Sequence, residues 1–325
     1  MANKSHFNSG HRSLNFLNKN GVKHSASIKG KEIEKTIQAI FITDAVEFLK
    51  QVPDSSIQLI LVDPPYNLDL DYWDTYENYL DWAKTWLDEI YRVLSDSGNC
   101  VIFGGFQYQD LKKGDLLEIM HYTRHHTDLR FTNLVIWYYK NGMSAHRFFA
   151  NRHEEAIWLS KTSKYFFDLD SVRVPFDEKT RELYKKDKRL NPDSVDKGKN
   201  PTNVWEIGRL NGNSTERVGH PTQKPTELIR RFVKGLSYKG STVLDFFAGS
   251  GTTGRVCIEE QRHSILVDSD KKLHQYFDMH IKQINSNIFL PKYKLLTNTN
   301  IDFVLEEINF ENRELSKNLI QATDV

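Results

Sequence analysis

The chain reads VLDFFAGSGTTG from residue 243 to residue 254, and this stretch decides the fold. An apolar run comes first, two glycines follow it, and threonines then begin a helical pattern. Gly249 and Gly251 let the backbone turn sharply and approach a ligand closely, because glycine adopts conformations closed to other residues. Thr252 or Ser250 can cap the helix that follows. The stretch therefore predicts a strand, a tight turn and a helix.

A second apolar run at 264–267 ends in Asp268, about 20 residues after the glycine turn. An acid in that place can accept hydrogen bonds from ribose hydroxyls. Gly254 completes a Gly-x-Gly-x-x-Gly spacing only fortuitously, and the chain has no Gly-Lys-Thr, so a P-loop is not expected. The spacing alone indicates a nucleotide-like ligand, and a strand-to-helix turn that binds nothing remains the alternative.

Strands and helices alternate on both sides of a polar middle region. Strands are expected at 36–42, 56–62, 100–103, 131–139, 156–160, 164–167, 242–247 and 264–267. Helices are expected at 44–51, 76–94, 225–236, 252–261 and 271–284. Such alternation predicts an α/β fold with a Rossmann-like, doubly wound and mostly parallel sheet. The nearly continuous apolar run at 56–62 is typical of a strand covered on both faces.

The middle region, from about residue 168 to 219, loses this periodicity and gains Asn, Pro, Gly and Lys. Eight Lys and Arg oppose four acids between residues 179 and 199. We expect an insertion with a basic face, although a solvated loop is the plainer interpretation. Residues 1–35 form a polar segment without a visible period, and residues 287–325 give no clear pattern.

Composition sets limits on the function. The 325 residues carry a formal net charge of only +1, so any surface for nucleic acid must come from local asymmetry. Cys100 and Cys257 sit in apolar stretches and are expected to be buried thiols. His121, His125 and His126 have no supporting Cys or carboxylate spacing, so no metal site is expected. No apolar run approaches about 18 residues, and we expect a cytoplasmic protein.

The apolar run at 56–62 stops at Asp63-Pro64-Pro65-Tyr66, where doubly wound sheets bind ligands. The prolines fix the backbone. An exocyclic base amine is a poor nucleophile, because its lone pair is delocalised into the ring. Acceptors on Asp63 and on the Pro64 carbonyl can bond its hydrogens during in-line attack on a sulfonium methyl. Tyr66 offers a flat face to a base swung out of a duplex. A plain strand terminus with a surface tyrosine is the alternative.

The two stretches together resemble the β-class DNA amino-methyltransferases. In that family an Asp-Pro-Pro-Tyr motif precedes a Phe-x-Gly-x-Gly motif, with the target-recognition region between them. Here residues 63–66 precede the basic insert and then 247–251. The stretch HPTQKP at 220–225 resembles the family's additional cofactor segment, and Asp44 matches an acid placed against the cofactor adenine. The resemblance covers about residues 36–284.

The resemblance implies a seven-stranded methyltransferase sheet, S-adenosylmethionine as cofactor and the N6 amine of adenine in double-stranded DNA as target. It implies a catalytic half at 36–167, a target-recognition insert at 168–219, a cofactor-binding half at 220–286, a flexible arm at 1–35 and a C-terminal extension at 287–325.

The site residues implied by the resemblance fall into three groups, with no metal ligands. The catalytic residues are Asp63, Pro64, Pro65 and Tyr66. The cofactor-binding residues are Asp44, Ala45, Asp63, Pro64, Leu70, His220, Gln223, Lys224, Pro225, Phe246, Phe247, Ala248, Gly249, Ser250, Gly251, Thr252, Thr253 and Asp268. The DNA-binding residues are Asn141, Arg147, Arg152, Lys185, Lys186, Lys188, Arg189, Lys197, Lys199 and Arg209.

Four segments, at 141–145, 147–155, 186–192 and 200–205, resemble one member of the family that methylates the inner adenine of GAATTC. They imply the same target here and a bacterial or phage restriction-modification system. A homodimer is possible, and a cognate endonuclease would be a functional partner without necessarily binding. Thr252 departs from that member, which has Val there, and this change should leave cofactor binding intact.

Three other functions compete with this interpretation. An N4-cytosine methyltransferase uses the same geometry, although such relatives more often carry Ser where this chain has Asp63. Enzymes that methylate protein glutamine or an RNA amine more often show Asn-Pro-Pro-Tyr after the cofactor loop, so the motif order argues against them. A DNA-binding remnant without turnover is disfavoured because Asp63, Tyr66 and the glycine turn all remain.

Overall fold

The computed structural model describes residues 33, 35–67, 76–106, 115–142, 145–147, 149–285 and 290–322, with side chains described up to residue 312. Nearly all of the expected N-terminal arm, and Leu70, therefore lie outside the described residues. Among the helices described, none combines the length and the apolar character that a membrane crossing requires.

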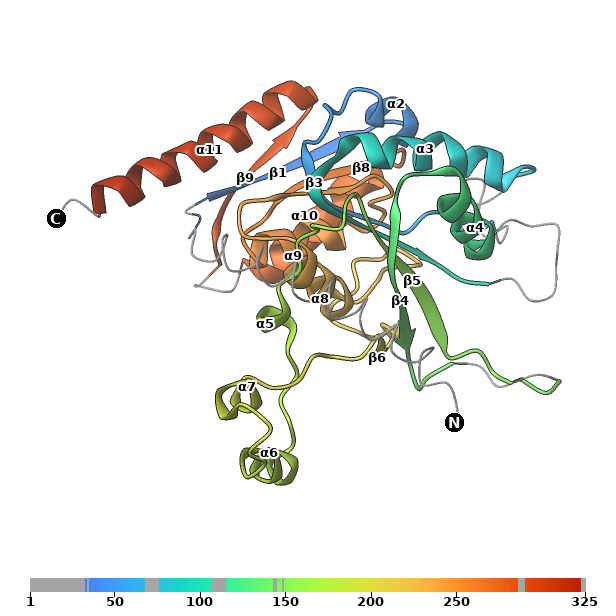
Figure 1. Cartoon of the computed structure of the whole chain (residues 1–325). Coiled ribbons are helices and arrows are strands. Elements are labelled where there is room, and N and C mark those ends of the chain that lie inside the picture. Colours follow the sequence, from blue (N-terminus) through green and yellow to red (C-terminus); the bar gives the residue numbers. More distant parts are fainter. Residues whose placement is uncertain are drawn as a thin grey trace.

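The described residues contain one nine-stranded sheet in the order β6-β4-β5-β3-β2-β7-β8-β1-β9 (Figure 1). The strands are β1 (Lys35–Ile42), β2 (Ile57–Val62), β3 (Leu94–Gly104), β4 (Arg130–Tyr138), β5 (His153–Ser160), β6 (Val204–Glu206), β7 (Thr242–Asp245), β8 (His263–Asp268) and β9 (Lys292–Thr297). Only β5 runs antiparallel to its neighbours, β3 and β4. The prediction of a doubly wound, mostly parallel sheet is confirmed, and the edge strands β6 and β9 extend it beyond the seven strands expected.

The chain leaves β2 and β7 in opposite directions, although these two strands are parallel neighbours. From β2 it continues to β3 on one side, and from β7 it continues to β8 on the other. A crevice forms at the carboxyl ends of two strands where the connections diverge in this way. All six residues of β2 are buried, as the apolar run predicts, so this strand fixes the crevice from inside the core.

Helices cover both faces of the sheet (Figure 1). One face packs against α2 (Ala45–Leu49), α3 (Tyr79–Val93), α4 (Leu116–His126) and α11 (Ile301–Ala322), with Trp86 and Val304 in its core. The other face packs against α8 (Thr226–Leu236), α9 (Thr252–Glu259) and α10 (Lys272–Ile284), with Phe232 and Phe277 buried beneath them. The C-terminal segment therefore contributes core residues, a role its sequence does not reveal.

A small lobe projects from the body below these layers (Figure 1). It contains α6 (Glu178–Lys185) and α7 (Pro192–Asp196), and α5 (Leu169–Val172) precedes it. A bridge between Val174 and Lys199 closes its base, with backbone hydrogen bonds in both directions. We call residues 174–199 the basic lobe. After it the chain returns to the sheet as β6, whose Trp205 is buried.

The prediction of a strand at 164–167 is wrong. Those residues have irregular backbone, although Tyr165 and Phe166 are buried. Their aromatic side chains pack against Trp158 and Tyr238 rather than alternating across a sheet. The apolar character that indicated a strand thus reflects core packing of a connection.

Candidate active site

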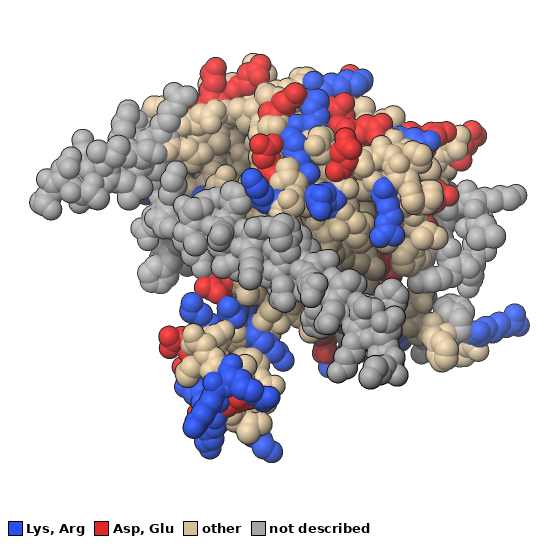
Figure 2. Space-filling model, viewed as in Figure 1, with Lys and Arg blue, Asp and Glu red and all other residues tan. Residues whose placement is uncertain are grey.

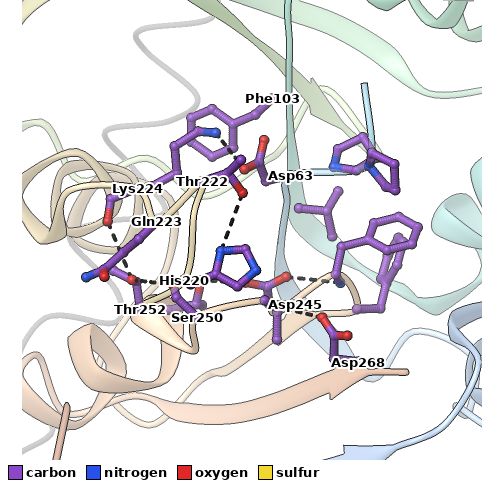
Figure 3. Close-up of a pocket in the computed structure, with 18 of the residues that line it drawn as sticks. Asp63, Phe103, His220, Thr222, Gln223, Lys224, Asp245, Ser250, Thr252 and Asp268 are labelled. Atoms are coloured by element: carbon purple, nitrogen blue, oxygen red, sulfur yellow. Dashed lines mark hydrogen bonds and ion pairs between the residues drawn. The ribbon is translucent and has the colours of Figure 1, made fainter. Parts of the chain in front are cut away.

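Four strands deliver the predicted residues to one edge of the sheet. Asp44 follows β1, Asp268 ends β8, the glycine turn follows β7, and Asp63 follows β2. These strands are neighbours in the order β2-β7-β8-β1, so their carboxyl ends adjoin. Together with the segment before α8 they line a cavity of about 440 Å³ (Figure 3). Its size suits a small-molecule ligand.

The glycine turn needs its glycines for two reasons. Gly249 and Gly251 adopt φ angles of 47° and 76°, which other residues rarely take. A side chain at Gly254 would place its Cβ 2.7 Å from the side chains of Leu266 and Phe277. Gly254 therefore lets α9 pack closely on the sheet, which corrects the expectation that its spacing is fortuitous.

Asp268 and Asp44 are held in place by backbone groups. Asp268 accepts hydrogen bonds from the backbone N–H groups of Gly249 and Asp270, both at 2.8 Å. Asp44 caps α2, and its Oδ1 accepts hydrogen bonds from the backbone N–H groups of Val46 and Glu47. A carboxylate has about four acceptor positions. Both groups thus remain able to accept from a ligand in the cavity that they line.

Asp245 is a cavity residue that sequence reasoning missed. Burial raises its pKa from 3.8 to about 7. It accepts from the Thr253 hydroxyl at 2.6 Å and from the Phe247 N–H at 3.2 Å, so it ties the glycine turn to the start of α9. An acid inside an otherwise apolar strand was the signal available in the sequence.

The segment 63–66 is braced from both sides. The Tyr79 hydroxyl donates to the Pro65 carbonyl at 2.8 Å, and the Tyr66 hydroxyl donates to Asp63 Oδ1 at 2.7 Å. Burial, and then the negative charges of Asp63 and Glu154, raise the pKa of Tyr66 well above its usual value. The tyrosine therefore stays protonated and keeps donating to Asp63 across the physiological pH range.

Lys224 contacts the carboxylate of Asp63 directly, a contact that sequence reasoning missed. Its ammonium lies 2.5 Å from Asp63 Oδ2 and 3.4 Å from Glu154 Oε2, and its side chain is only 9% exposed. Burial alone would lower the pKa of Lys224, but the two carboxylates outweigh it and raise that pKa. Figure 3 shows Lys224 and Asp63 pointing toward one another, with the Phe103 ring beside the ammonium.

The rest of the segment at 220–225 shapes the cavity wall. Gln223 accepts from the Val218 N–H at 2.8 Å and donates to the Glu216 carbonyl at 2.9 Å, so its amide holds the turn together. The His220 ring lies against Gly249, where a Cβ would come within 3.2 Å of it. Burial lowers the pKa of His220. Pro225 begins α8, and this helix start carries Lys224 to Asp63.

Other predicted cofactor residues also line the cavity. These are Ala45, Pro64, Phe246, Phe247, Ala248, Ser250, Thr252 and Thr253. Gly251 and Pro225 are not in its lining; they are the N-cap residues of α9 and α8. The Ser250 and Thr252 hydroxyls bond one another at 2.9 Å.

The predicted DNA-binding residues separate into two groups. Asn141, Arg147 and Arg152 lie in the β4–β5 connection, and Arg209 follows β6. Asn141 bonds Asn211 at 2.9 Å, and Arg209 lies over the Tyr139 ring and lines the cavity. This first group thus lies at the carboxyl edge of the sheet, and within it Arg209 lines the same cavity as Asp63.

The second group lies on the basic lobe. Figure 2 shows Lys and Arg side chains gathered on the lobe. Several are neutralised locally, because Lys185 pairs with Asp196, Arg189 with Asp187 and Lys197 with Asp170. Lys199 lies over the Phe176 ring. Lys186 and Lys188 are exposed. The structure does not bring this group to the cavity.

Metal-ligating residues give no alternative site in the described part of the chain, where no group of three His, Cys, Asp or Glu could hold an ion. Cys100 and Cys257 are free and buried, as expected.

The cavity lining contains six carboxylates and three basic side chains, an excess of negative charge that favours a cationic ligand.

Comparisons with known proteins point to one family. A family model described as DNA methylase, for N6 and N4 methyltransferases, matches residues 57–279. The Type II methyltransferase M.HpaI of Haemophilus parainfluenzae is 34% identical over 255 residues, 77% of this chain and 74% of that protein. The DNA adenine methyltransferase YhdJ of Escherichia coli (strain K12) is 28% identical over 252 residues, 74% and 81% of the two chains.

Solved structures share the fold. The PvuII DNA methyltransferase, described as cytosine-N4-specific, has a TM-score of 0.58 and 18% identity over 88% of this chain and 96% of that chain. A complex of M1.HpyAVI with SAM has a TM-score of 0.50 and 24% identity over 77% of this chain and 100% of that chain.

Proposed function

The chain belongs to the N6/N4 DNA methylase family, and from this membership we propose that it transfers a methyl group from S-adenosylmethionine to the N6 amine of adenine in double-stranded DNA. The observation that carries the proposal is the position of Asp63. Its carboxylate lies in the crevice between β2 and β7, in the same cavity as the glycine turn.

The cavity suits S-adenosylmethionine in size and in charge. Its excess of carboxylates complements a ligand that carries a sulfonium and an ammonium. Gly249 lines the cavity without a side chain, so a ligand can approach its backbone closely. We propose that Asp44, Asp268, His220 and the turn at 246–253 hold it. The SAM complex of the structural relative M1.HpyAVI supports this assignment.

The bound cofactor supplies an electrophilic methyl group, and residues of this chain prepare the amine that receives it. Asp63 and the Pro64 carbonyl accept the two amine hydrogens, which draws the nitrogen lone pair away from the ring. The Tyr79 bond to Pro65 and the Tyr66 bond to Asp63 fix these acceptors beforehand. Tyr66 offers a ring against which the flipped base stacks. Asp63 then holds the proton that the methylated amine loses.

Adenine is favoured over cytosine by the relative YhdJ, whose name specifies adenine, and by Asp63 in the family motif. Cytosine N4 is the second candidate, because the PvuII enzyme of that specificity has the same fold. Digesting methylated DNA to nucleosides and measuring N6-methyladenine against N4-methylcytosine decides between them. N4-methylcytosine as the product would overturn the adenine assignment.

We propose GAATTC as the target, methylated on its inner adenine. The four segments at 141–145, 147–155, 186–192 and 200–205 resemble those of the RsrI adenine methyltransferase, and two of them lie in the insert. The test incubates the protein with labelled cofactor and plasmid DNA and then adds an endonuclease that cuts GAATTC. Protection supports the site. Incorporation of label without protection supports the methyltransferase activity and rejects GAATTC as its target.

Contacts with DNA are proposed for both groups of basic residues. In the group at the carboxyl edge Arg209 lines the cavity, while Arg147 and Arg152 lie in the β4–β5 connection, and we assign this group to base edges around a flipped base. The basic lobe projects from the body, and we assign it to phosphates farther along the duplex. A cognate endonuclease and a homodimer are further expectations. Protection of DNA in cells tests the endonuclease, and sedimentation tests the homodimer.

A further inference from the structure

We propose that Lys224 donates a hydrogen bond to the ring nitrogen next to the target amine, so that Asp63 and Lys224 together recognise the amino edge of the flipped base. This inference rests on the proposed function and goes beyond it. It names a specificity-determining residue for the base and states which atom of the base that residue contacts.

The geometry supplies an acceptor and a donor side by side. Asp63 Oδ2 and Lys224 Nζ are 2.5 Å apart, and both residues line the cavity. Tyr66, whose ring offers the proposed stacking surface, has its centroid 5.4 Å from the ammonium. A base stacked on Tyr66 with its amine at Asp63 therefore brings its next edge atom toward Lys224.

The edges of the bases show which ones this pair accepts. Adenine presents the N6 amine as donor beside N1 as acceptor, and cytosine presents N4 beside N3 in the same sense. Guanine and thymine present a carbonyl acceptor beside a ring N–H donor, which places acceptor against carboxylate and donor against ammonium. An unpaired polar group of this kind is rejected strongly in a buried site. The pair thus selects amino bases and excludes keto bases.

Lys224 has the hydrogen needed for this contact. An ammonium has three donors. Its short bond is to Asp63 at 2.5 Å, whereas its contacts with Glu154 Oε2 and the Tyr66 hydroxyl are both 3.4 Å. A base acceptor can replace one of these long contacts while Asp63 keeps the short one. Glu154, on β5, lies 3.4 Å from the ammonium and also lines the cavity.

The contact orients the base without activating the amine. Donation to the ring nitrogen draws electron density into the ring, which does not help the amine attack. The loss of this contact should therefore appear in the affinity for the target base, with the methyl-transfer rate nearly unchanged. This split distinguishes base recognition from a general loss of active-site structure.

The experiment places the target adenine opposite an abasic site, so that no base pair opposes flipping, and replaces it by 1-deazaadenine, which has C–H in place of N1 and keeps the amine. 7-Deazaadenine, altered away from this edge, is the matched control substrate. Duplex binding is measured with S-adenosylhomocysteine present, and single-turnover methylation is measured with saturating duplex. For the wild-type protein we expect 1-deazaadenine to bind roughly 10- to 100-fold more weakly than adenine, and 7-deazaadenine to bind like adenine.

The Lys224→Met variant should bind the adenine duplex more weakly than the wild-type protein by a similar factor. It should bind the 1-deazaadenine duplex as well as it binds the adenine duplex. Lys234→Met, on α8 but outside the cavity lining, should behave as wild type. Equal binding of adenine and 1-deazaadenine by the wild-type protein overturns the proposal even if Lys224→Met does not fold. Undiminished discrimination in Lys224→Met also overturns it. Absence of methylation of the adenine duplex itself would instead reject the proposed function.

Discussion

Replacing Asp63 by Asn tests both the proposed chemistry and the packing of segment 63–66. The substitution keeps the size of the side chain and removes its charge. Lys224 then loses its 2.5 Å ionic partner and keeps only Glu154, at 3.4 Å. A hydrogen bond to a buried charge contributes about 1.5–3 kcal/mol, so we expect unfolding to become easier by about 2 kcal/mol. For a chain of this size the melting temperature should fall by roughly 3 °C.

The methylation rate should fall much further, by roughly 10²–10⁴-fold, because an amide neither stabilises positive charge on the amine nor takes its proton. The assay measures single-turnover transfer from labelled S-adenosylmethionine, and cofactor affinity is measured separately by calorimetry. The affinity for S-adenosylmethionine should be largely unchanged. Asp54→Asn is the matched control, because Asp54 is a surface partner of Arg92, 76% exposed, and should change little. Wild-type turnover by Asp63→Asn would refute the proposed role of Asp63.

A further three predictions concern the surroundings of the site. Burial raises the pKa of Asp245 from 3.8 to about 7, so its contribution to stability is complete below about pH 4 and is lost as the pH rises to 7. Urea titrations should show Asp245→Asn gaining stability relative to wild type across that window. Gly254→Ala should lower stability by about 1–3 kcal/mol in thermal melts, because its Cβ meets Leu266 and Phe277, whereas Gly208→Ala adds its Cβ to open space and should not. Lys186→Ala and Lys188→Ala should each reduce the salt dependence of duplex binding by about one counterion, and an unchanged slope would show that the basic lobe does not face phosphate.

The sequence predicted the parts of the site that are encoded locally. Buried parallel strands appear as continuous apolar runs, and a ligand edge lies where such runs stop. That rule placed Asp63, Asp268 and the glycine turn correctly at the same edge of the sheet. The role of Gly254 was underestimated, because a spacing gives no information about how closely a helix approaches a strand.

The missing parts depend on contacts between distant segments. Lys224 and Asp63 are 161 residues apart, and no local pattern shows that an ammonium will be buried against that carboxylate. Glu154 likewise lies beside Lys224 only because the fold turns it there. The C-terminal helix α11 was unreadable for a related reason, since its core residues Ile301, Val304 and Ile308 are few and other apolar residues, such as Phe303 and Phe310, are exposed and obscure the pattern.

The separation of the basic residues follows from the direction of one strand. β5 is antiparallel, so it begins at the carboxyl edge beside the cavity and ends at the opposite edge. In the chain that follows, the Asp168 N–H donates a hydrogen bond to the Gly235 carbonyl near the end of α8. The chain therefore enters the basic lobe far from Asp63. β6 then runs parallel to β4 and returns the chain to the cavity at Arg209. Under the proposed function, a duplex with its flipped base at Asp63 therefore meets Arg209 close to the target, and the lobe contributes only where the same duplex extends that far.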